Sequence, residues 1–375
     1  MKTMVVIADD ITGAAEMAGI AMRHGFTVQL TIGEQYPADA SADVVVMATD
    51  TRSGSEQEAR LVMQRIMRQV GKCSPTPSLY KKTDSVLRGH IAAELQEIMS
   101  ATGLTKALLL AQNPSKGRVV SHGCYTINGT PLDKTPFSYD PEFPAHSQQV
   151  QMLVNGGKPL AVEAPITDGI NIADATSDED IRRQLDKTDH CTLLAGGADC
   201  FDALLSKTFS KPGNVSKQAH LSTEGHTVII CGSTQSQSLL QQPYIRRIGA
   251  VEITMPDDVF HGMATPDQWM EELCAAYRCH GTIIVAIGHA ATGGKAYAVR
   301  LRHIMSEAAK HLVAADAPST LVIEGGATAY AVLQQLGWQQ FIAEKEFAPG
   351  VVSISHEATS VVLKPGSYPW GSLFG

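Results

Sequence analysis

The stretch Val5-Val6-Ile7-Ala8-Asp9-Asp10-Ile11-Thr12-Gly13, near the N-terminus, decides the fold class. Its apolar run over 5–8 predicts a buried strand, and the spacing of apolar residues over 13–23 predicts a helix directly after it. The same alternation of strand and helix recurs in both halves of the chain. Because this alternation is typical of parallel sheets covered by helices, we predict an α/β fold with largely parallel sheets.

The length of the chain and one polar segment together predict two domains. The chain has 375 residues, whereas a single domain usually has about 100–150. Residues 211–225 contain several Lys, Ser and Gly residues and few large apolar ones, as linkers do. We therefore predict an α/β domain over 1–210, a linker over 211–225 and a second α/β domain over 226–375, with an interdomain cleft.

The composition disfavours several classes of protein. The formal net charge is −8, which is unfavourable for non-specific nucleic-acid binding. The first apolar run is too short for a signal peptide, and no stretch reaches the roughly 18–20 apolar residues of a membrane span. The 7 cysteines lack CxxC pairs and predict reduced thiols. We expect a cytoplasmic protein that binds neither nucleic acid nor a membrane.

Two adjacent carboxylates, Asp9 and Asp10, directly follow the first predicted strand. Ligands of open α/β sheets bind at the carboxyl ends of the strands. Asp10 or Thr12 could instead cap the following helix. A cap explains one carboxylate but not two, because two adjacent charges repel unless hydroxyls or a cation lie beside them. Carboxylates also accept hydrogen bonds from sugar hydroxyls and can act as a general base.

Charged and hydroxyl side chains follow two further predicted strands. The segment Lys82-Thr83-Asp84-Ser85-Val86-Leu87-Arg88 stands between a strand and a helix, and Arg52 follows the predicted strand over 44–48. Arginine is suited to bidentate recognition of a carboxylate. The alternative is a solvated charged loop or, for Asp84, an ion pair with Lys82 or Arg88. The candidate substrate-binding residues are Asp9, Asp10, Arg52, Lys82, Thr83, Asp84, Ser85 and Arg88.

A segment rich in Pro and Gly, residues 113–147, interrupts the alternation of strands and helices. The residues from Tyr125 to Pro131 suggest a hairpin or a long loop within it. A loop of this length in a compact domain is usually functional. We therefore expect this segment to serve the site.

The C-terminal half has three glycine turns that follow predicted strands, at 231–234, 324–328 and 364–367. Glycine lets backbone N–H groups approach a phosphate, and a helix N-terminus favours the anion. Each turn could simply connect a strand to a helix, but three in one domain favour nucleotide binding. The candidate contacts are Ser233, Gly288, Gly325, Gly326, Ala327, Thr328 and Gly366.

Three other enzyme classes are disfavoured by their missing motifs. The segment 288–296 resembles a P-loop, but Gly294 stands where the lysine belongs and Ala296 lacks the hydroxyl that binds magnesium. No GxGxxG follows the first strand, which disfavours an NAD-dependent dehydrogenase. No GxSxG nucleophile elbow is present, which disfavours a hydrolase of that kind.

Taken together, the motifs resemble the four-carbon acid sugar kinase family. The resemblance runs from residue 3 to Ser367. It implies a sugar-acid-binding N-terminal domain and an ATP-binding C-terminal domain. It also implies phosphorylation of the terminal hydroxyl of D-threonate, L-threonate, D-erythronate or a 3-oxo-tetronate. The motifs that carry it lie at 8–14, 82–89, 117–118, 123–125 and 325–329.

Within that resemblance, we expect ATP and Mg²⁺ as cofactors and a small sugar acid as the partner, with a homodimer left open. Asp84 is the first choice for the general base, because Lys82 and Arg88 flank it and would keep it ionised. Asp10 is the second choice, and Arg88 is the third candidate catalytic residue. A kinase for a longer aldonate and a non-catalytic regulator that binds a nucleotide or metabolite remain as alternatives.

Overall fold

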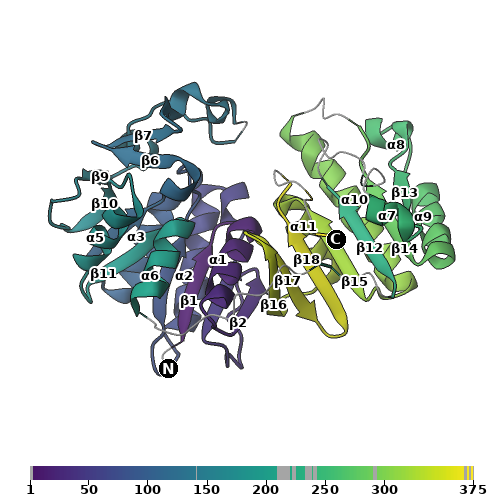
Figure 1. Cartoon of the computed structure of the whole chain (residues 1–375), viewed down its shortest axis with the longest axis horizontal. Helices are drawn as coiled ribbons and strands as arrows, with labels where there is room; N and C mark the ends of the chain where they lie inside the picture. Colours follow the sequence, from purple (N-terminus) through teal and green to yellow (C-terminus); the bar gives the residue numbers. More distant parts are fainter. Residues whose placement is uncertain are drawn as a thin grey trace. The chain divides into compact units, whose positions relative to one another are not determined.

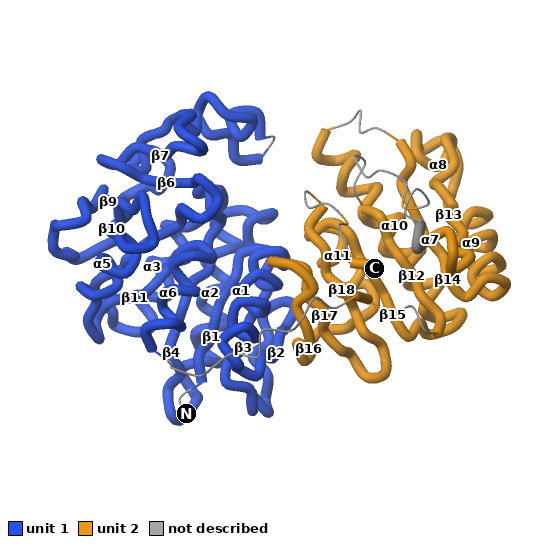
Figure 2. The backbone as a smooth tube through the Cα atoms, viewed as in Figure 1, with its two compact units in different colours: residues 1–214 blue, residues 215–375 orange. Residues whose placement is uncertain are grey.

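The computed structural model describes residues 3–140, 142–208, 220–221, 225–232, 239, 243–289, 294–366, 370 and 373–374. The chain forms two compact units, residues 1–214 and 215–375 (Figure 2). Both units combine parallel strands with helices, so the predicted α/β class is confirmed (Figure 1). The predicted linker lies almost wholly outside the described residues. The exact domain boundaries and the interdomain cleft stay predictions.

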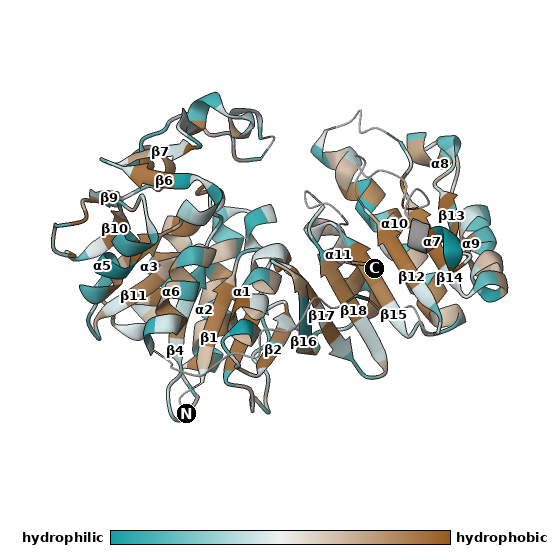
Figure 3. Cartoon of the chain, viewed as in Figure 1, coloured by the Kyte–Doolittle hydropathy of each residue, from teal (hydrophilic) through white to brown (hydrophobic). Residues whose placement is uncertain are grey.

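The first unit is built on parallel strands, and every pairing among them is parallel. Apolar residues that are buried along their length explain why these segments form central strands (Figure 3). In sheet order the strands are β2 (Val28–Ile32), β3 (Val44–Ala48), β1 (Met4–Ala8), β4 (Ser78–Lys82), β11 (Thr192–Gly196), β5 (Lys106–Leu110), β10 (Gly169–Ala173) and β9 (Gly157–Leu160).

Helices cover both faces of this sheet (Figure 1). One face carries α1 (Ile11–Arg23), α5 (Asp178–Asp186) and α6 (Ala198–Thr208), and the other carries α2 (Glu56–Val70) and α3 (Ile91–Thr102). From β1 the chain passes through α1 to β2, which lies on one side of β1 in the sheet. From β3 it passes through α2 to β4, which lies on the other side of β1. This reversal is a topological switch point, where ligands of such sheets bind.

Local sequence signals explain where these helices begin. Asp10 caps α1 by accepting a hydrogen bond from the backbone N–H of Gly13. Ser55 and Glu58 form a reciprocal capping box at the start of α2. The apolar face of α2 then packs on Val5 and Met47 of the sheet, in the main core of the unit. The polar ends of β1 and β3 are thereby held at one edge.

The segment that interrupts the alternation forms a small separate antiparallel sheet, so the predicted hairpin is confirmed. It comprises β6 (Arg118–Ser121), β7 (Cys124–Ile127) and β8 (Thr130–Pro131). Isolated bridges from Val120 to Ala175 and from Cys124 to Gln149 attach it to the rest of the unit. Short helices flank it: η2 (Pro114–Lys116), η3 (Leu132–Lys134), η4 (Pro136–Tyr139) and α4 (Val150–Leu153). We call residues 113–140 the hairpin segment.

The second unit is also α/β, with an antiparallel end. Its strands follow the order β13 (Val251–Thr254), β14 (Thr282–Ala286), β12 (Thr227–Cys231), β15 (Thr320–Glu324), β18 (Thr359–Lys364), β17 (Val351–His356) and β16 (Gln340–Ala348). The pairings are parallel from β13 to β18 and antiparallel in β17 and β16. Its helices are α7 (Pro243–Arg247), α8 (Asp257–His261), α9 (Asp267–His280), α10 (Lys295–Ala315) and α11 (Gly326–Leu336).

Candidate active site

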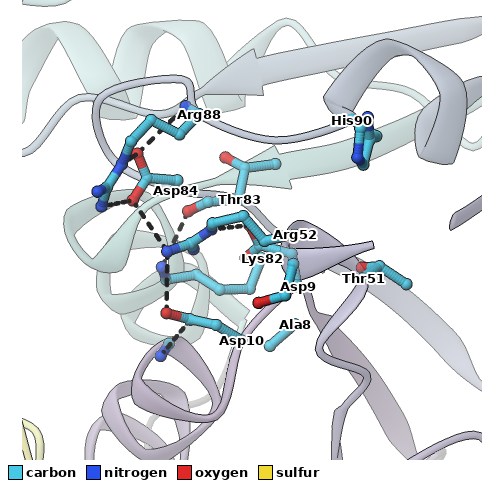
Figure 4. A network of polar contacts seen from close by, with 12 residues as sticks. Ala8, Asp9, Asp10, Thr51, Arg52, Lys82, Thr83, Asp84, Arg88 and His90 are labelled. Atoms are coloured by element: carbon cyan, nitrogen blue, oxygen red, sulfur yellow. Dashed lines mark hydrogen bonds and ion pairs between the residues drawn. The ribbon is translucent and has the colours of Figure 1, made fainter. Parts of the chain in front are cut away.

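Three neighbouring strands of the first unit end at the same level, and each is followed by candidate residues. Ala8 of β1 stands in register with Ala48 of β3 and with Lys82 of β4. The chain therefore brings Asp9, Arg52 and the segment after β4 to one edge of the sheet (Figure 4). This edge is the topological switch point described above.

Arg52 lies at the centre of these residues. Its Nε is 2.8 Å from Asp9 Oδ2, and its Nη1 is 3.0 Å from Asp10 Oδ2 and 3.5 Å from Asp84 Oδ1 (Figure 4). Burial alone would raise the pKa of Asp9, but Arg52 and Lys81 outweigh burial and lower that pKa. Arg52 is therefore the cation that the adjacent carboxylates require.

Asp84 is held on both oxygens by N–H donors. Its carboxylate accepts hydrogen bonds from the backbone N–H groups of Val86 and Arg88, and from Arg88 Nε at 3.0 Å and Nη2 at 2.8 Å. Burial would raise the pKa of Asp84, but Arg52 and Arg88 lower it well below its usual range. The ion pair proposed as the alternative role is thus present, and these donors make the carboxylate a weak proton acceptor.

Asp10 combines both roles that the sequence left open. Its Oδ1 caps α1 through Gly13 N at 2.8 Å, while its Oδ2 pairs with Arg52. The side chain is 23% exposed, against 2% for Asp9 and 7% for Asp84. A Cβ at Gly13 would lie 2.8 Å from Asp10 Oδ1 and 3.1 Å from Lys82 Nζ. A side chain at position 13 would therefore have to displace Asp10 Oδ1, which caps α1, or Lys82 Nζ.

A second group of charges lies around Glu16 of α1, which the sequence analysis did not single out. Lys82 Nζ lies 3.7 Å from Glu16 Oε2 and donates to the carbonyl of Thr83. Lys116 Nζ of the hairpin segment lies 2.8 Å from Glu16 Oε1. Burial would raise the pKa of Glu16, but Lys82 and Lys116, together with Arg118, lower it. Three cations, one at the end of β4 and two in the hairpin segment, therefore gather at one carboxylate.

The hairpin segment supplies further contacts to the candidate residues. Arg118 Nη1 and the hydroxyl of Tyr125 donate to the side-chain and backbone oxygens of Ser85, respectively. Arg88 Nη1 lies 3.0 Å from Asp140 Oδ2. The sequence marked this segment as functional but did not identify which of its side chains reach the site.

A buried ion pair is linked by a hydrogen bond to the residue that precedes Arg52. Lys81 Nζ lies 3.1 Å from Glu94 Oε2, and the two side chains are 0% and 1% exposed. Thr51 Oγ1 donates to the other oxygen of Glu94 at 2.5 Å. Because Thr51 immediately precedes Arg52, this network holds the chain that carries the central arginine.

The glycine turns of the second unit also meet at one edge. Cys231 of β12 pairs with Glu324 of β15, and Glu324 pairs with Lys364 of β18. Gly232 N donates to the carbonyl of Glu324, and Gly325 N donates to the carbonyl of Lys364. The structure thus brings together the turns at Gly232, Gly325 and Gly366.

Tight packing explains why glycine stands in two of these turns. A Cβ at Gly232 would lie 2.0 Å from Thr328 Oγ1, and Gly325 has a φ of +96° just before α11. Gly288 follows β14, which neighbours β12. Gly326, Ala327 and Thr328 form the first turn of α11, whereas the predicted contact Ser233 lies outside the described residues. The ligand contacts of all these residues stay predictions.

Both halves of the chain match models of known protein families. Residues 4–191 match the model of a sugar-binding N-terminal domain, and residues 228–368 match the model of a nucleotide-binding C-terminal domain. The chain belongs to the four-carbon acid sugar kinase family. The resemblance expected from its motifs is therefore confirmed.

Curated relatives are similar over different lengths. The D-threonate kinase of Salmonella typhimurium is 32% identical over 151 residues, which cover 40% of this chain and 36% of that protein. The matched part of the chain thus spans about a third of the length of that relative. The D-threonate kinase of Cupriavidus necator is 26% identical, over 92% of this chain and 89% of that protein. The 3-oxo-tetronate kinase of Methylobacterium radiotolerans is 26% identical, over 98% and 97%.

Solved structures share the fold of this chain. A crystal structure from Salmonella typhimurium matches with a TM-score of 0.78 and 20% identity, over 100% of this chain and 98% of that one. One from Haemophilus influenzae matches with a TM-score of 0.74 and 18% identity, over 99% and 98%. Within the part of the chain that the structure describes, we find no helix with the length and apolar character of a membrane span.

Proposed function

We propose that this chain phosphorylates the terminal hydroxyl of a four-carbon sugar acid, with ATP as the donor. The observation that carries the proposal is the arrangement of Asp9, Asp10 and Asp84 around Arg52 at the switch point of the sugar-binding domain. Carboxylates held in this way can accept hydrogen bonds from several hydroxyls of one small ligand. D-threonate, L-threonate, D-erythronate and a 3-oxo-tetronate are the candidate substrates.

In this proposal Asp10, rather than Asp84, is the general base. Asp10 has the most exposed carboxylate of the three, and its backbone N–H donor and Arg52 orient it. Asp84 is occupied by Arg88 and two backbone N–H groups, so its role is to position Arg52 and Arg88. Asp10 would accept the proton of the terminal hydroxyl as the phosphoryl group is transferred, which commonly contributes about 10²–10⁴-fold to the rate.

The second unit would bind the nucleotide through the backbone of its glycine turns. The N-terminus of α11, preceded by Gly325, favours the negative charge of a phosphate. Among the described residues, no group of three or more His, Cys, Asp or Glu side chains could hold a metal ion. This fits a Mg²⁺ ion that is held mainly by the phosphates of ATP and needs at most one or two protein carboxylates. When bound, Mg²⁺ would neutralise charge on those phosphates.

A coupled assay of ADP release tests this function. The panel comprises the four-carbon acids named above together with five- and six-carbon aldonates. We expect the highest kcat/KM with one of the four-carbon acids. A higher value with a longer acid would support the aldonate alternative. ATP binding without ADP release on any acid would instead indicate a non-catalytic regulator.

A further inference from the structure

Arg118 differs from the other arginines of the candidate site in the groups that surround it. The guanidinium groups of Arg52 and Arg88 are paired with carboxylates. Within the described parts of the chain, Arg118 has no carboxylate at ion-pair distance. Its partners are the hydroxyl of Ser85 and the ring of Phe137, whose centroid lies 5.8 Å from its guanidinium carbon.

The surroundings of Arg118 fix its orientation without neutralising its charge. Arg88 lies against the same ring of Phe137, with its guanidinium carbon 5.4 Å from the centroid. Tyr125, in the strand paired with that of Arg118, donates to the carbonyl of Ser85 and so holds the residue that Arg118 contacts. A guanidinium carries five N–H donors, so contact with one hydroxyl leaves capacity for an anion.

Charge is distributed unevenly across the candidate site. On one side, Arg52 and Arg88 face the carboxylates of Asp9, Asp10, Asp84 and Asp140. Next to the hairpin segment, the cationic groups of Lys82, Lys116 and Arg118 all act on the carboxylate of Glu16, and Lys82 acts on Asp9 and Asp84 as well. A sugar acid has the matching distribution, since it carries an anion at one end and neutral hydroxyls along the rest of its chain.

We propose that Arg118 binds the carboxylate of the sugar acid and determines the preference of the site for acids over neutral ligands. The hydroxyls then extend toward the carboxylate-rich side, and the terminal hydroxyl lies beside Asp10. A partly buried guanidinium without a carboxylate partner is costly, so an anionic ligand is its favourable complement. Arginine is also the side chain best matched to a planar carboxylate. The inference rests on the proposed kinase function and adds the residue that selects the substrate.

The test compares an acid with its own amide, because the two share every hydroxyl and differ in charge. kcat/KM is measured for the best four-carbon acid and for its primary amide, or the inhibition constant where the amide is not turned over. Arg118→Gln should reduce the preference for the acid over the amide by about 10- to 150-fold, the usual contribution of a charge-assisted contact. The KM for ATP should not change. Arg118→Lys keeps the charge and should retain a large part of the preference.

Arg182→Gln is the matched control, because Arg182 is an exposed arginine of α5 that pairs with Asp178. It should leave the preference for the acid unchanged. An equal loss for acid and amide in both Arg118 variants would overturn the inference and assign Arg118 a structural role or a contact with the transferred group. If wild type and Arg118→Gln phosphorylate the acid equally well, the inference alone fails. If the wild-type protein phosphorylates no four-carbon acid, the proposed function fails, and the inference fails with the proposed function.

Discussion

Lys364 Nζ lies 2.7 Å from Glu324 Oε1, and the two side chains are only 1% and 2% exposed. The same ammonium group donates to the carbonyl of Pro365 and lies 4.4 Å from the centroid of the Trp370 ring. Glu324 immediately precedes the turn at Gly325, and Lys364 begins the turn that contains Gly366. This buried ion pair therefore joins two of the turns that we assign to the nucleotide.

Removing one partner of this pair should destabilise the protein. Lys364→Met leaves the charge of Glu324 buried without its partner, which typically costs about 3–5 kcal/mol. The double variant Glu324→Gln with Lys364→Met removes both charges and should recover part of that loss. Denaturant unfolding of the three proteins measures the effect. Equal stability of Lys364→Met and wild type would show that the pair does not hold the turns together.

Gly232→Ala should weaken ATP binding. The added methyl group would lie within 3 Å of the Thr328 side chain, and relieving the overlap requires movement of the turn or of α11. Overpacking of this kind typically costs about 1–3 kcal/mol of stability. Titration calorimetry of ATP into the full chain measures the affinity. Gly71→Ala is the control, because Gly71 lies in the first unit with an ordinary helical φ of −65°, and its added methyl group would lie 3.1 Å from the backbone oxygen of Met67. Unchanged ATP affinity would argue against this turn as a nucleotide site.

Asp10→Asn and Asp84→Asn should distinguish the general base from the carboxylate that positions Arg52 and Arg88. Asp10→Asn should lower kcat by about 10²–10⁴-fold while the acid still binds. Asp84→Asn should first raise the KM for the acid and lower stability, because Arg52 and Arg88 lose a common partner. Steady-state kinetics and binding of the acid distinguish these outcomes. A kcat loss confined to Asp84→Asn would restore Asp84 as the base.

Arg88→Ala should affect use of the acid far more than binding of ATP. The substitution removes the bidentate partner of Asp84 and the contact with Asp140. A charge-assisted contact contributes about 1.5–3 kcal/mol, so kcat/KM for the acid should fall by at least tenfold. Thermal unfolding must show a folded variant. Normal kinetics in that folded protein would remove Arg88 from the site.

Stability should decrease in acid because of the carboxylates around Arg52. The pKa values of Asp9 and Asp84 are lowered in the folded protein, against about 3.9 in an unfolded chain. Their stabilisation is therefore complete above about pH 4 and is lost as the pH falls below that value. Asp84→Asn should make the free energy of unfolding less dependent on pH between about 2 and 4. An unchanged pH dependence would contradict the lowered pKa of Asp84.

Part of the fold was predictable because local patterns determine it. The alternation of apolar strands and amphipathic helices predicted β1, α1 and β3 close to their observed bounds. Strands β9 and β10 were not predicted, although they join the parallel strands of the first unit. β9 has four residues, of which Lys158 and Pro159 are exposed and only Leu160 is a large buried apolar residue, so its short sequence has no strong apolar signal. β16 was not predicted either, since its pairing in an antiparallel end depends on strands elsewhere in the chain.

The sequence by itself determined which polar residues stand at the strand ends: Asp9 and Asp10 after β1, and Lys82 to Ser85 at the end of β4 and directly after it. It did so because the change from an apolar run to polar residues is a local feature. Only the tertiary structure decided that Arg52 pairs with Asp9, Asp10 and Asp84, and that Arg118 reaches Ser85 from a separate hairpin. The physical reason is that the order of the strands in the sheet determines which residues, distant in sequence, lie close together. The groups that surround a carboxylate in the folded protein then determine whether it can act as a base or is held in an ion pair.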